Sequence, residues 1–311
     1  MPETGSGRGI IALTGATGFI GQHLQRALLN AGHRVRALVR QSSTTHHALR
    51  SDCEISVVDL RDEASLATAL ENVQAVIYAA GSVRGRRIED FQLANVQGVE
   101  AMAAAVASQA IEIPLLLLSS LAASAPELSW YAQSKAAGER LLRNGPLGQW
   151  SIFRPPAVYG AGDKEMRPIL KLVTRGLVPL IAPDEQRLPF IEVSDLVAAM
   201  LAWVAHPGRC AGRTFAIDDG TSKGYDWRQI QTLIGPRRAL RIRIPSPLLK
   251  ALGHVNLSVA KVVGYAPMLT PGKVRELTCL NWACNNAEFT AATGWTPRIG
   301  LAEGVARLFD H

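Results

Sequence analysis

The stretch Ile-Ile-Ala-Leu-Thr-Gly-Ala-Thr-Gly-Phe-Ile-Gly at residues 10–21 constrains the fold of this chain more than any other. Its apolar first half is typical of a buried strand, and apolar residues then recur with helical spacing through Leu28. In such a strand–turn–helix unit, Gly15 permits the turn, Gly18 lets the backbone approach a diphosphate, and Gly21 allows close helix packing. The start of the helix attracts an anion. The stretch therefore predicts the phosphate loop of a nucleotide site, although glycines at such a connection can also be purely steric.

The composition indicates a globular chain. Its 311 residues, 48% apolar and 19% charged, suffice for one dominant domain and a smaller lobe. No run of about 18 apolar residues could span a bilayer, and the first nine residues lack the order of a secretion signal. Neither a Cys-x-x-Cys pair nor a zinc spacing with histidine occurs among Cys53, Cys210, Cys279 and Cys284. We therefore expect a cytoplasmic protein with reduced thiols, no integral membrane segment and no metal site.

The net charge of +7 is compatible with nucleic acid, an anionic membrane surface, or an anionic cofactor and substrate. The basic residues are spread along the chain, with modest clusters at residues 84–87 and 237–243. Neither cluster is interleaved with aromatic residues, as a surface for single-stranded nucleic acid is. We expect a small-molecule substrate and no nucleic-acid partner.

Strand-like and helix-like patterns alternate along the first half of the chain. Strands are expected at residues 10–14, 34–39, 54–58, 75–80 and 115–118, with helical patterns between them that include 63–70 and 88–109. The fourth strand ends in the small residues Ala79, Ala80 and Gly81, which let the chain lie close to a cofactor. The alternation implies a parallel sheet covered by helices on both faces.

The residue just past the second expected strand bears on the choice of dinucleotide. An acid at that position binds the 2′-hydroxyl of NAD, whereas an arginine suits the 2′-phosphate of NADP. Arg40 occupies the position here, and no acid follows before Asp52. We therefore expect NADP(H), with NAD(H) as the alternative if Arg40 is simply a surface residue. Asp59, after the third strand, could accept a hydrogen bond from the adenine amino group or cap the helix at 63–70.

Candidate acid–base residues follow the fifth strand. Tyr131 and Lys135 are four residues apart, so on a helix they share one face. A lysine cation close to a tyrosine stabilises the tyrosinate and lowers the phenol pKa from about 10 toward the range useful for proton transfer. A serine at the end of the strand at 115–118 could orient a substrate carbonyl or hydroxyl. With the upstream phosphate loop, these residues predict an acid–base site rather than a tyrosine beside a surface lysine.

Taken together, these motifs resemble the extended, epimerase/dehydratase-like branch of the short-chain dehydrogenase/reductase family. The resemblance runs from residue 10 to about residue 200. The matching segments are 14–21, Asp59-Leu60, Ser119-Ser120, Tyr131-x-x-Ser134-Lys135, 154–160 and 189–196.

The resemblance implies a nicotinamide cofactor over the carboxyl edge of the sheet, beside a Ser/Tyr/Lys site. Tyr131 matches the acid/base, and Lys135 matches the residue that holds the ribose and lowers the phenol pKa. Ser120 matches the serine that orients the substrate, with Ser119 as the second candidate and Ser124 as the third. Asn95 matches an asparagine that lines the site. The expected cofactor contacts are Gly15, Thr17, Gly18, Phe19, Ile20, Gly21, Arg40, Asp59, Leu60, Ala79, Ala80, Gly81, Lys135 and the backbone from Pro155 to Val158.

One departure from the family pattern bears on the substrate. Epimerases and dehydratases of this branch carry a longer insertion between the serine and the tyrosine, whereas Ser120 and Tyr131 are eleven positions apart. The Val-Tyr-Gly of that insertion, part of the wall expected around a nucleotide-sugar, is missing. Leu121-Ala122 also occupies the place of the Asp-Glu pair of dehydratases. Sugar dehydration is therefore disfavoured.

The pattern changes after residue 160, where helical stretches alternate with irregular segments. We expect an α/β fold, a Rossmann-type doubly wound parallel sheet with a smaller, mainly helical C-terminal substrate lobe. The NADP-binding domain is assigned to residues 1–160 and about 187–218, and the lobe to about 161–186 and 219–311. The apolar helical stretch at 247–263 could line a substrate pocket, touch a membrane surface or pack against the main domain. Three tryptophans are expected in the lobe's own core: Trp227, Trp282 and Trp295.

The favoured function is NADPH-dependent reduction of a carbonyl, or the reverse oxidation of an alcohol, on a small or lipid-like molecule. Hydride passes from the nicotinamide to the carbonyl carbon while Tyr131, beside Ser120, protonates the oxygen. A nucleotide-sugar epimerase with tightly bound NAD is the second enzyme hypothesis. The third hypothesis is a non-catalytic dinucleotide-binding regulator or assembly subunit, although such relatives often lack the tyrosine or the lysine. The helices at 88–109 and 131–143 could form a homodimer contact.

Overall fold

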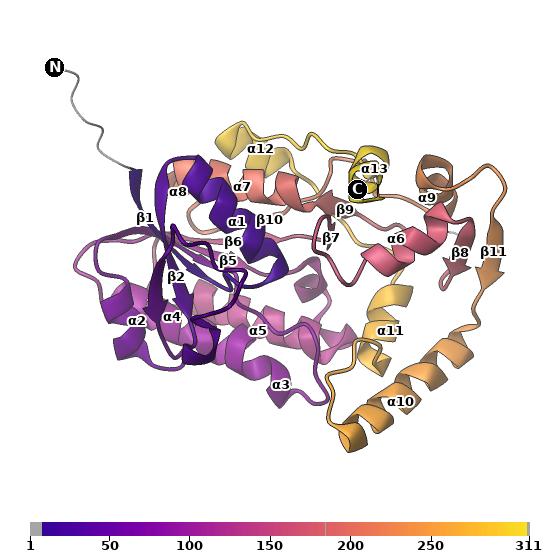
Figure 1. Ribbon diagram of the computed structural model, residues 1–311, viewed down its shortest axis with the longest axis horizontal. Coiled ribbons are helices and arrows are strands. Elements are labelled where there is room, and N and C mark those ends of the chain that lie inside the picture. The colour runs from indigo at the N-terminus through magenta and orange to yellow at the C-terminus, as the bar shows by residue number, and fades with distance from the viewer. Residues whose placement is uncertain (1–7, 184, 310–311) are drawn as a thin grey trace.

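The computed structural model of the protein describes residues 8–183 and 185–309 (Figure 1). Residues 1–7, most of the segment considered above for a secretion signal, lie outside the described residues. A seven-stranded sheet has the order β3-β2-β1-β4-β5-β6-β10, and every neighbouring pair is parallel. The strands are β1 (Arg8–Thr14), β2 (His33–Val39), β3 (Glu54–Val57), β4 (Val73–Tyr78), β5 (Leu115–Leu118), β6 (Trp150–Arg154) and β10 (Arg213–Ala216). The strand order reverses between β1 and β4, the place where open α/β sheets bind ligands.

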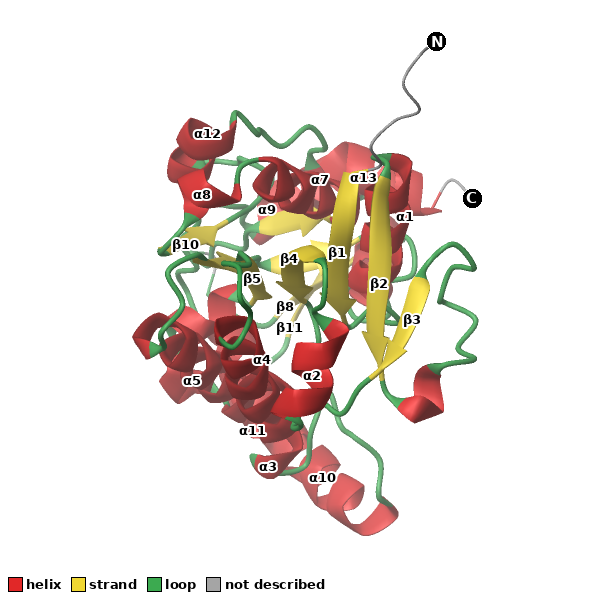
Figure 2. Ribbon diagram, turned by 90° about the vertical axis from the view of Figure 1, so that its left-hand side faces the viewer, coloured by secondary structure: helices red, strands yellow, loops and turns green. Residues whose placement is uncertain are grey.

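Helices cover both faces of the sheet (Figure 2). One face carries α1 (Phe19–Asn30) and α7 (Val193–Ala205), which pack on each other. The other face carries α2 (Glu63–Ala69), α4 (Gly98–Ala107) and α5 (Trp130–Asn144). Because both faces are covered, the central strands are apolar throughout rather than alternating, and all four residues of β5 are buried. The predicted Rossmann-type doubly wound parallel sheet is confirmed.

The helix expected at residues 88–109 is interrupted. The short α3 (Glu89–Gln92) passes into a π-helical turn, η2 (Leu93–Gln97), before α4 continues. Gly138 of α5 packs against the Asn95 carbonyl of this turn so closely that a Cβ there would clash. The wider turn therefore meets α5 at a position where only glycine fits, and π-turns of this kind are frequent at functional sites.

A smaller lobe, built mainly of helices, lies beside the sheet and has its own core around Trp227, Phe190 and Tyr159. Its helices are α6 (Arg167–Thr174), α9 (Trp227–Ile234), α10 (Ser246–Val263), α11 (Pro271–Thr278) and α13 (Leu301–Phe309), with the parallel pairs β7 (Ala157–Tyr159)–β9 (Phe190–Glu192) and β8 (Leu177–Leu180)–β11 (Leu240–Arg243). Across the described part of the chain, none of the helices combines the length and apolar character that crossing a bilayer requires.

The expectation that Trp295 and Trp282 anchor the lobe's core is wrong. After α11 the chain returns to the large sheet, where α12 (Ala287–Thr293) contacts α8 (Pro207–Cys210). Phe289 of α12 stacks edge-on against Phe153 with ring centroids 5.0 Å apart, and Trp295 lies 5.6 Å from Phe289. Trp295 therefore belongs to the core of the sheet. Trp282 is half-buried in the wall of the cavity described below.

Candidate active site

The glycine-rich turn after β1 has the shape that a dinucleotide requires. Gly15 has a φ of +69°, and a Cβ built on it would lie 2.5 Å from the Ala79 carbonyl oxygen at the end of β4. Ala80 N donates a hydrogen bond to Thr14 Oγ1 (3.0 Å), which joins the ends of the two central strands. Gly18 caps α1 without a side chain, so no side chain occupies the first N–H groups of the helix. These residues fit a diphosphate at the N-terminus of α1.

The other predicted loop residues surround the same turn. Gly21 is buried against the Gly15 carbonyl, where any side chain would push α1 away from β1. Leu60 follows β3 and is half-buried. It packs on the core of the sheet face that carries α2 and α4. Partial exposure leaves three side chains at the surface of the turn, namely Thr17, Phe19 and Ile20. The structure thus brings the predicted phosphate-loop residues together at the switch point of the sheet.

Arg40 lies at the end of β2 and is exposed. Two other arginines on this strand, Arg34 and Arg36, are both paired with Glu54. The Arg40 guanidinium has no such partner among residues 8–183 and 185–309. Arg40 is therefore an exposed arginine at the carboxyl end of β2 that is available to an anionic ligand.

Asp59 lies beyond β3 on the surface. Its carboxylate accepts a hydrogen bond from the Arg61 guanidinium (2.7 Å), and this hydrogen bond lowers the pKa of Asp59 to about 2. The cap of α2 is Asp62, whose Oδ1 accepts from Ala64 N (3.1 Å). The alternative in which Asp59 caps that helix is wrong, and a contact between Asp59 and adenine stays a prediction.

Ser120 and Tyr131 meet at the carboxyl end of β5. Ser120 follows the strand and caps the turn η3 (Leu121–Ser124) by accepting from Ala122 N (3.2 Å). Ser129 caps α5 in the same way through Ala132 N (2.9 Å), and this sets Tyr131 in the first turn of the helix. The Ser120 side chain lies near enough to the Tyr131 hydroxyl to lower the pKa of that phenol. Both residues line one cavity.

Lys135 is buried one turn further along α5, and its Nζ donates to the Leu118 carbonyl at the end of β5 (2.9 Å). Gly81 lies directly against it, since a Cβ on Gly81 would be 3.0 Å from Lys135 Nζ and 3.0 Å from Asn95 Oδ1. Asn95 is buried in the π-turn, where its Nδ2 donates to the Ser82 carbonyl (2.9 Å) and to Ser134 Oγ (2.9 Å). The structure therefore brings Gly81, Asn95 and Lys135 together.

The expectation that the phenol pKa is lowered is wrong for the protein chain itself. Burial raises the pKa of Tyr131 to about 12. The Ser120 hydroxyl lowers this pKa but opposes burial only in part, and the Glu276 carboxylate raises it further. Burial also lowers the pKa of Lys135 to about 8, against the opposing charge of Glu139. Desolvation therefore favours the neutral form of both side chains.

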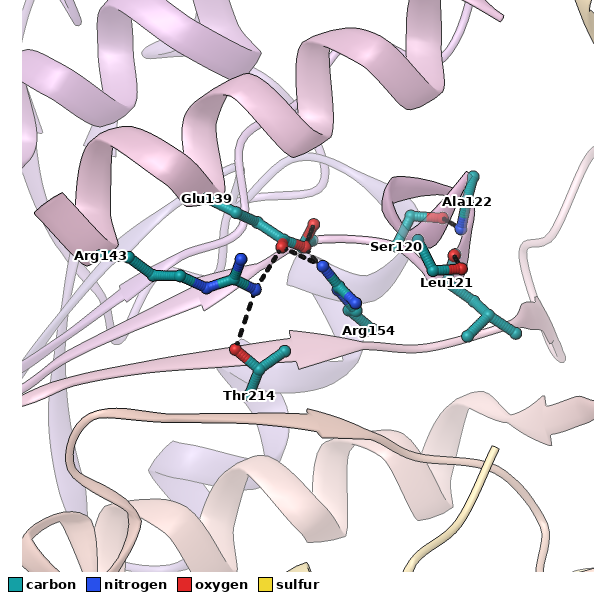
Figure 3. A network of polar contacts seen from close by, with 9 residues as sticks. Ser120, Leu121, Ala122, Glu139, Arg143, Arg154 and Thr214 are labelled. Atoms are coloured by element: carbon teal, nitrogen blue, oxygen red, sulfur yellow. Dashed lines mark hydrogen bonds and ion pairs between the residues drawn. The ribbon is translucent and has the colours of Figure 1, made fainter. Parts of the chain in front are cut away.

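A buried carboxylate network lies beside the site (Figure 3). Glu139 is fully buried and accepts hydrogen bonds from Arg154 Nε (2.8 Å) and from an Arg143 guanidinium nitrogen (2.8 Å). Arg143 also reaches Thr214 Oγ1 on β10 (3.1 Å). Sequence reasoning missed Glu139, which is the fourth residue after Lys135 and so lies on the same face of α5.

The three candidate serines have different hydrogen-bond partners. Ser119 Oγ donates to Glu139 (2.6 Å) and is buried, so its hydroxyl is engaged away from the cavity. Ser124 is exposed and donates to the Leu121 carbonyl (2.7 Å). Of the three, Ser120 lines the cavity beside Tyr131.

The cavity in front of Tyr131 has a volume of about 700 Å³. Leu121 N donates to the Pro155 carbonyl (2.9 Å), and this contact fixes the segment after β6 whose residues Pro156 and Val158 form part of the wall. The wall is mainly apolar, and its members from the lobe include Met166, Ile169, Leu170, Trp227, Leu257 and Trp282.

Three charged residues of the cavity wall lie on α11, namely Lys273, Arg275 and Glu276. Glu276 is buried and accepts hydrogen bonds from Ser129 Oγ and from Lys273 Nζ (2.9 Å). Arg275 Nε donates to the Leu128 carbonyl (2.7 Å) in η4 (Pro126–Leu128). The lobe is thereby fastened to the start of the helix that carries Tyr131. Sequence reasoning missed these contacts, which join segments almost 150 residues apart.

Comparisons with known proteins agree with this geometry. The model of the NAD-dependent epimerase/dehydratase family matches residues 11–217. A Caulobacter vibrioides protein named ceramide reductase is 34% identical over 309 residues, which cover 97% of this chain and 94% of that protein. A mitochondrial NADH dehydrogenase (ubiquinone) 1 alpha subcomplex subunit 9 from Arabidopsis thaliana is 28% identical over 216 residues, 67% of this chain and 54% of that protein.

The fold is also found among solved structures. The crystal structure of the Bordetella bronchiseptica enzyme WbmG in complex with NAD matches with a TM-score of 0.70 at 16% identity, over 100% of this chain and 95% of that one. At this identity the match concerns the fold alone. The family model and the first relative, together with the glycine turn and the Tyr131–Lys135 helix, show that this chain belongs to the NAD-dependent epimerase/dehydratase family, within the extended short-chain dehydrogenases/reductases.

Proposed function

We propose that this protein is an NADPH-dependent reductase that converts a ketone on a long-chain, ceramide-like lipid into an alcohol. The observation that carries the proposal is the mainly apolar cavity of about 700 Å³ with Ser120 and Tyr131 in its wall. A nucleotide-sugar carries a diphosphate and many hydroxyls, and the apolar greater part of this wall offers them few partners. The relative named ceramide reductase, similar over nearly the whole chain, supports a lipid.

In the proposed reaction a bound nicotinamide dinucleotide supplies the hydride, and side chains of the protein supply the proton and the hydrogen bonds. Tyr131, with its pKa raised to about 12, keeps its phenolic proton at neutral pH and donates it to the carbonyl oxygen. Ser120 donates a second hydrogen bond to that oxygen as negative charge develops on it. Lys135 holds the ribose of the dinucleotide and places a positive charge near the phenol.

In this proposal the two parts of the chain have separate tasks. The sheet domain, assigned above to residues 1–160 with about 187–218, binds the dinucleotide, and the lobe shapes the substrate space. Within these ranges the β7–β9 pair contributes to the core of the lobe, whereas α12, within residues assigned to the lobe, packs in the core of the sheet. The cavity wall supports this division, because Tyr131 comes from the sheet domain whereas Trp227 and Leu257 come from the lobe.

The choice of NADPH rests on Arg40, which is exposed and without an ion pair in the described residues. Arg40→Ala is expected to weaken NADPH binding by about tenfold to a hundredfold, because the variant loses a charge-assisted hydrogen bond to the 2′-phosphate. NADH binding should change less than about twofold, since NADH has no 2′-phosphate. Fluorescence titration of both cofactors measures the two constants. Arg209→Ala, at an exposed arginine of α8, is the control, and an equal loss for NADH and NADPH would contradict the role of Arg40.

The protonation of Lys135 sets an alkaline limit to the reaction. Because the pKa of Lys135 is lowered to about 8, its ammonium form is present below that pH and is lost above it, whereas Tyr131 remains protonated. We expect kcat/KM for reduction to be level at neutral pH and to fall about tenfold per pH unit above about pH 8. A pH profile of NADPH oxidation measures this. A profile that stays level to about pH 10 would remove the lysine charge from the mechanism.

The experiment that tests the function is NADPH oxidation with a panel of substrates. The panel contains N-acyl amino ketones of increasing chain length, which are oxidised forms of ceramides, together with short ketones and UDP-sugars. We expect kcat/KM to rise about fourfold per methylene, from about 0.8 kcal/mol for each buried CH₂, until the cavity is filled. Turnover of UDP-sugars with tightly bound NAD would overturn the proposal in favour of epimerisation. NADPH binding without oxidation on any substrate would favour a non-catalytic protein.

A further inference from the structure

Helix α10 presents apolar residues on two sides. On its inner side Leu249, Gly253 and Ala260 are buried, and a Cβ on Gly253 would lie 3.2 Å from Pro271 N at the start of α11. Its outer side lies at the edge of the molecule (Figure 1). Six exposed apolar residues follow this side and are called the outer stripe: Leu248, Leu252, Val255, Val259, Val262 and Val263.

The outer stripe is a continuous surface rather than a set of scattered residues. At about 100° of rotation per residue, its six members fall within an arc of about 100° along the whole helix. Val262 is 88% exposed and Val255 is 60% exposed. Contiguous exposed apolar surface of this kind marks an interaction site, and on an amphipathic helix it suits the headgroup region of a bilayer.

The segment of sequence that contains the outer stripe is strongly basic. Between Asp226 and Glu276 the sequence contains no acidic residue and nine basic ones, so all other residues of the chain together carry a net charge of −2. Apart from the half-buried Lys273, the nine are exposed: Arg228, Arg237, Arg238, Arg241, Arg243, Lys250, Lys261 and Arg275. Basic residues near an anionic lipid surface each contribute about 1 kcal/mol to its attraction. On α10 itself the charged residues are Lys250 and Lys261, both exposed, so the helix and the segment around it favour an anionic bilayer over a neutral one.

The same helix is a wall of the cavity. His254 and Leu257 of α10 line it, as do Leu269 and Thr270 in the connection to α11. The outer stripe and the cavity are thus on different sides of one helix, about 10 Å thick.

We propose that α10 docks the protein on the surface of an anionic lipid bilayer through the outer stripe, and that the substrate enters the cavity beside this helix. The entry of a lipid substrate rests on the proposed function. The docking itself rests on the stripe and the charge of residues 227–275 alone.

Vesicle co-sedimentation of the full chain tests the docking, with phosphatidylcholine vesicles and with vesicles that also contain phosphatidylglycerol. We expect binding to the anionic vesicles that weakens with salt and is at least about tenfold weaker on the neutral ones. Val259→Glu/Val262→Glu should lower the binding by at least about tenfold. The control Ile55→Glu/Ile111→Glu makes the same change of charge at two exposed residues outside α10 and should bind within about twofold of the wild type.

Three results would overturn the docking: no binding of the wild type, equal loss in both double variants, or a wild-type dimer that Val259→Glu/Val262→Glu converts to a monomer. The dimer result would assign the outer stripe to a second copy of the chain. Because the assay contains neither cofactor nor ketone, it separates docking from catalysis. Both double variants should reduce a short, water-soluble ketone at the wild-type rate, which also shows that they fold.

Discussion

Tyr131→Phe is expected to lower kcat for ketone reduction by about three orders of magnitude, within the range that positioned general acids contribute. The substitution removes the proton that the carbonyl oxygen receives and leaves the ring in the cavity wall beside Ser120. NADPH affinity should change by less than about twofold, because a general acid acts in the transition state rather than in cofactor binding. Steady-state NADPH oxidation and a binding titration measure the two effects.

Tyr265→Phe is the matched control for this variant. Tyr265 is an exposed tyrosine whose hydroxyl contacts Asn256 outside the cavity, so its loss should leave kcat within about twofold of the wild type. Turnover by Tyr131→Phe at more than about a tenth of the wild-type rate would remove Tyr131 from the proton transfer.

Glu139→Ala is expected to lower the free energy of unfolding by about 3 kcal/mol. The fully buried carboxylate accepts from Arg154, Arg143 and Ser119, and alanine leaves these donors without their acceptor. Because Arg143 is partly exposed, water can replace part of its contact with Glu139. The expected loss of unfolding free energy is therefore at the lower end of the range for broken buried ion pairs. Because the Glu139 charge raises the pKa of Lys135, the alkaline break in kcat/KM should also move to lower pH. Urea unfolding and the pH profile measure the two changes.

Glu288→Ala provides the comparison on the surface. Glu288 pairs with Arg213 at 3.0 Å but is 71% exposed, so its loss should cost at most about 1 kcal/mol. A similar cost for Glu139→Ala and Glu288→Ala would show that the buried network does not stabilise the fold.

The sheet could be predicted from the sequence because its signals are local. Glycines at fixed spacing and fully apolar strands specify a strand–turn–helix unit and a parallel sheet without knowledge of distant residues. The π-turn at Asn95 could not be predicted in this way. It lies where Gly138 of α5, more than 40 residues later in the sequence, packs against it. The local pattern of apolar residues does not indicate a contact with so distant a residue.

Tyr131 and Lys135 could be picked out for the same reason, since their four-residue spacing is a local signal. Their pKa values could not be predicted, because burial decides them and burial depends on the lobe as well as the sheet. Trp295 shows the same limit. The size and apolar character of this tryptophan favour burial, but its sequence position does not say in which core it is buried.

The central claim is that the protein transfers hydride from NADPH to a lipid ketone, and an isotope-labelling experiment tests it most directly. The protein is incubated with NADPH that carries deuterium at both C4 positions and with an N-acyl amino ketone of long chain length, and the product is analysed by mass spectrometry. The account predicts one deuterium on the new carbinol carbon and one NADP⁺ formed per alcohol. Absence of the alcohol, or an alcohol without deuterium, would contradict it.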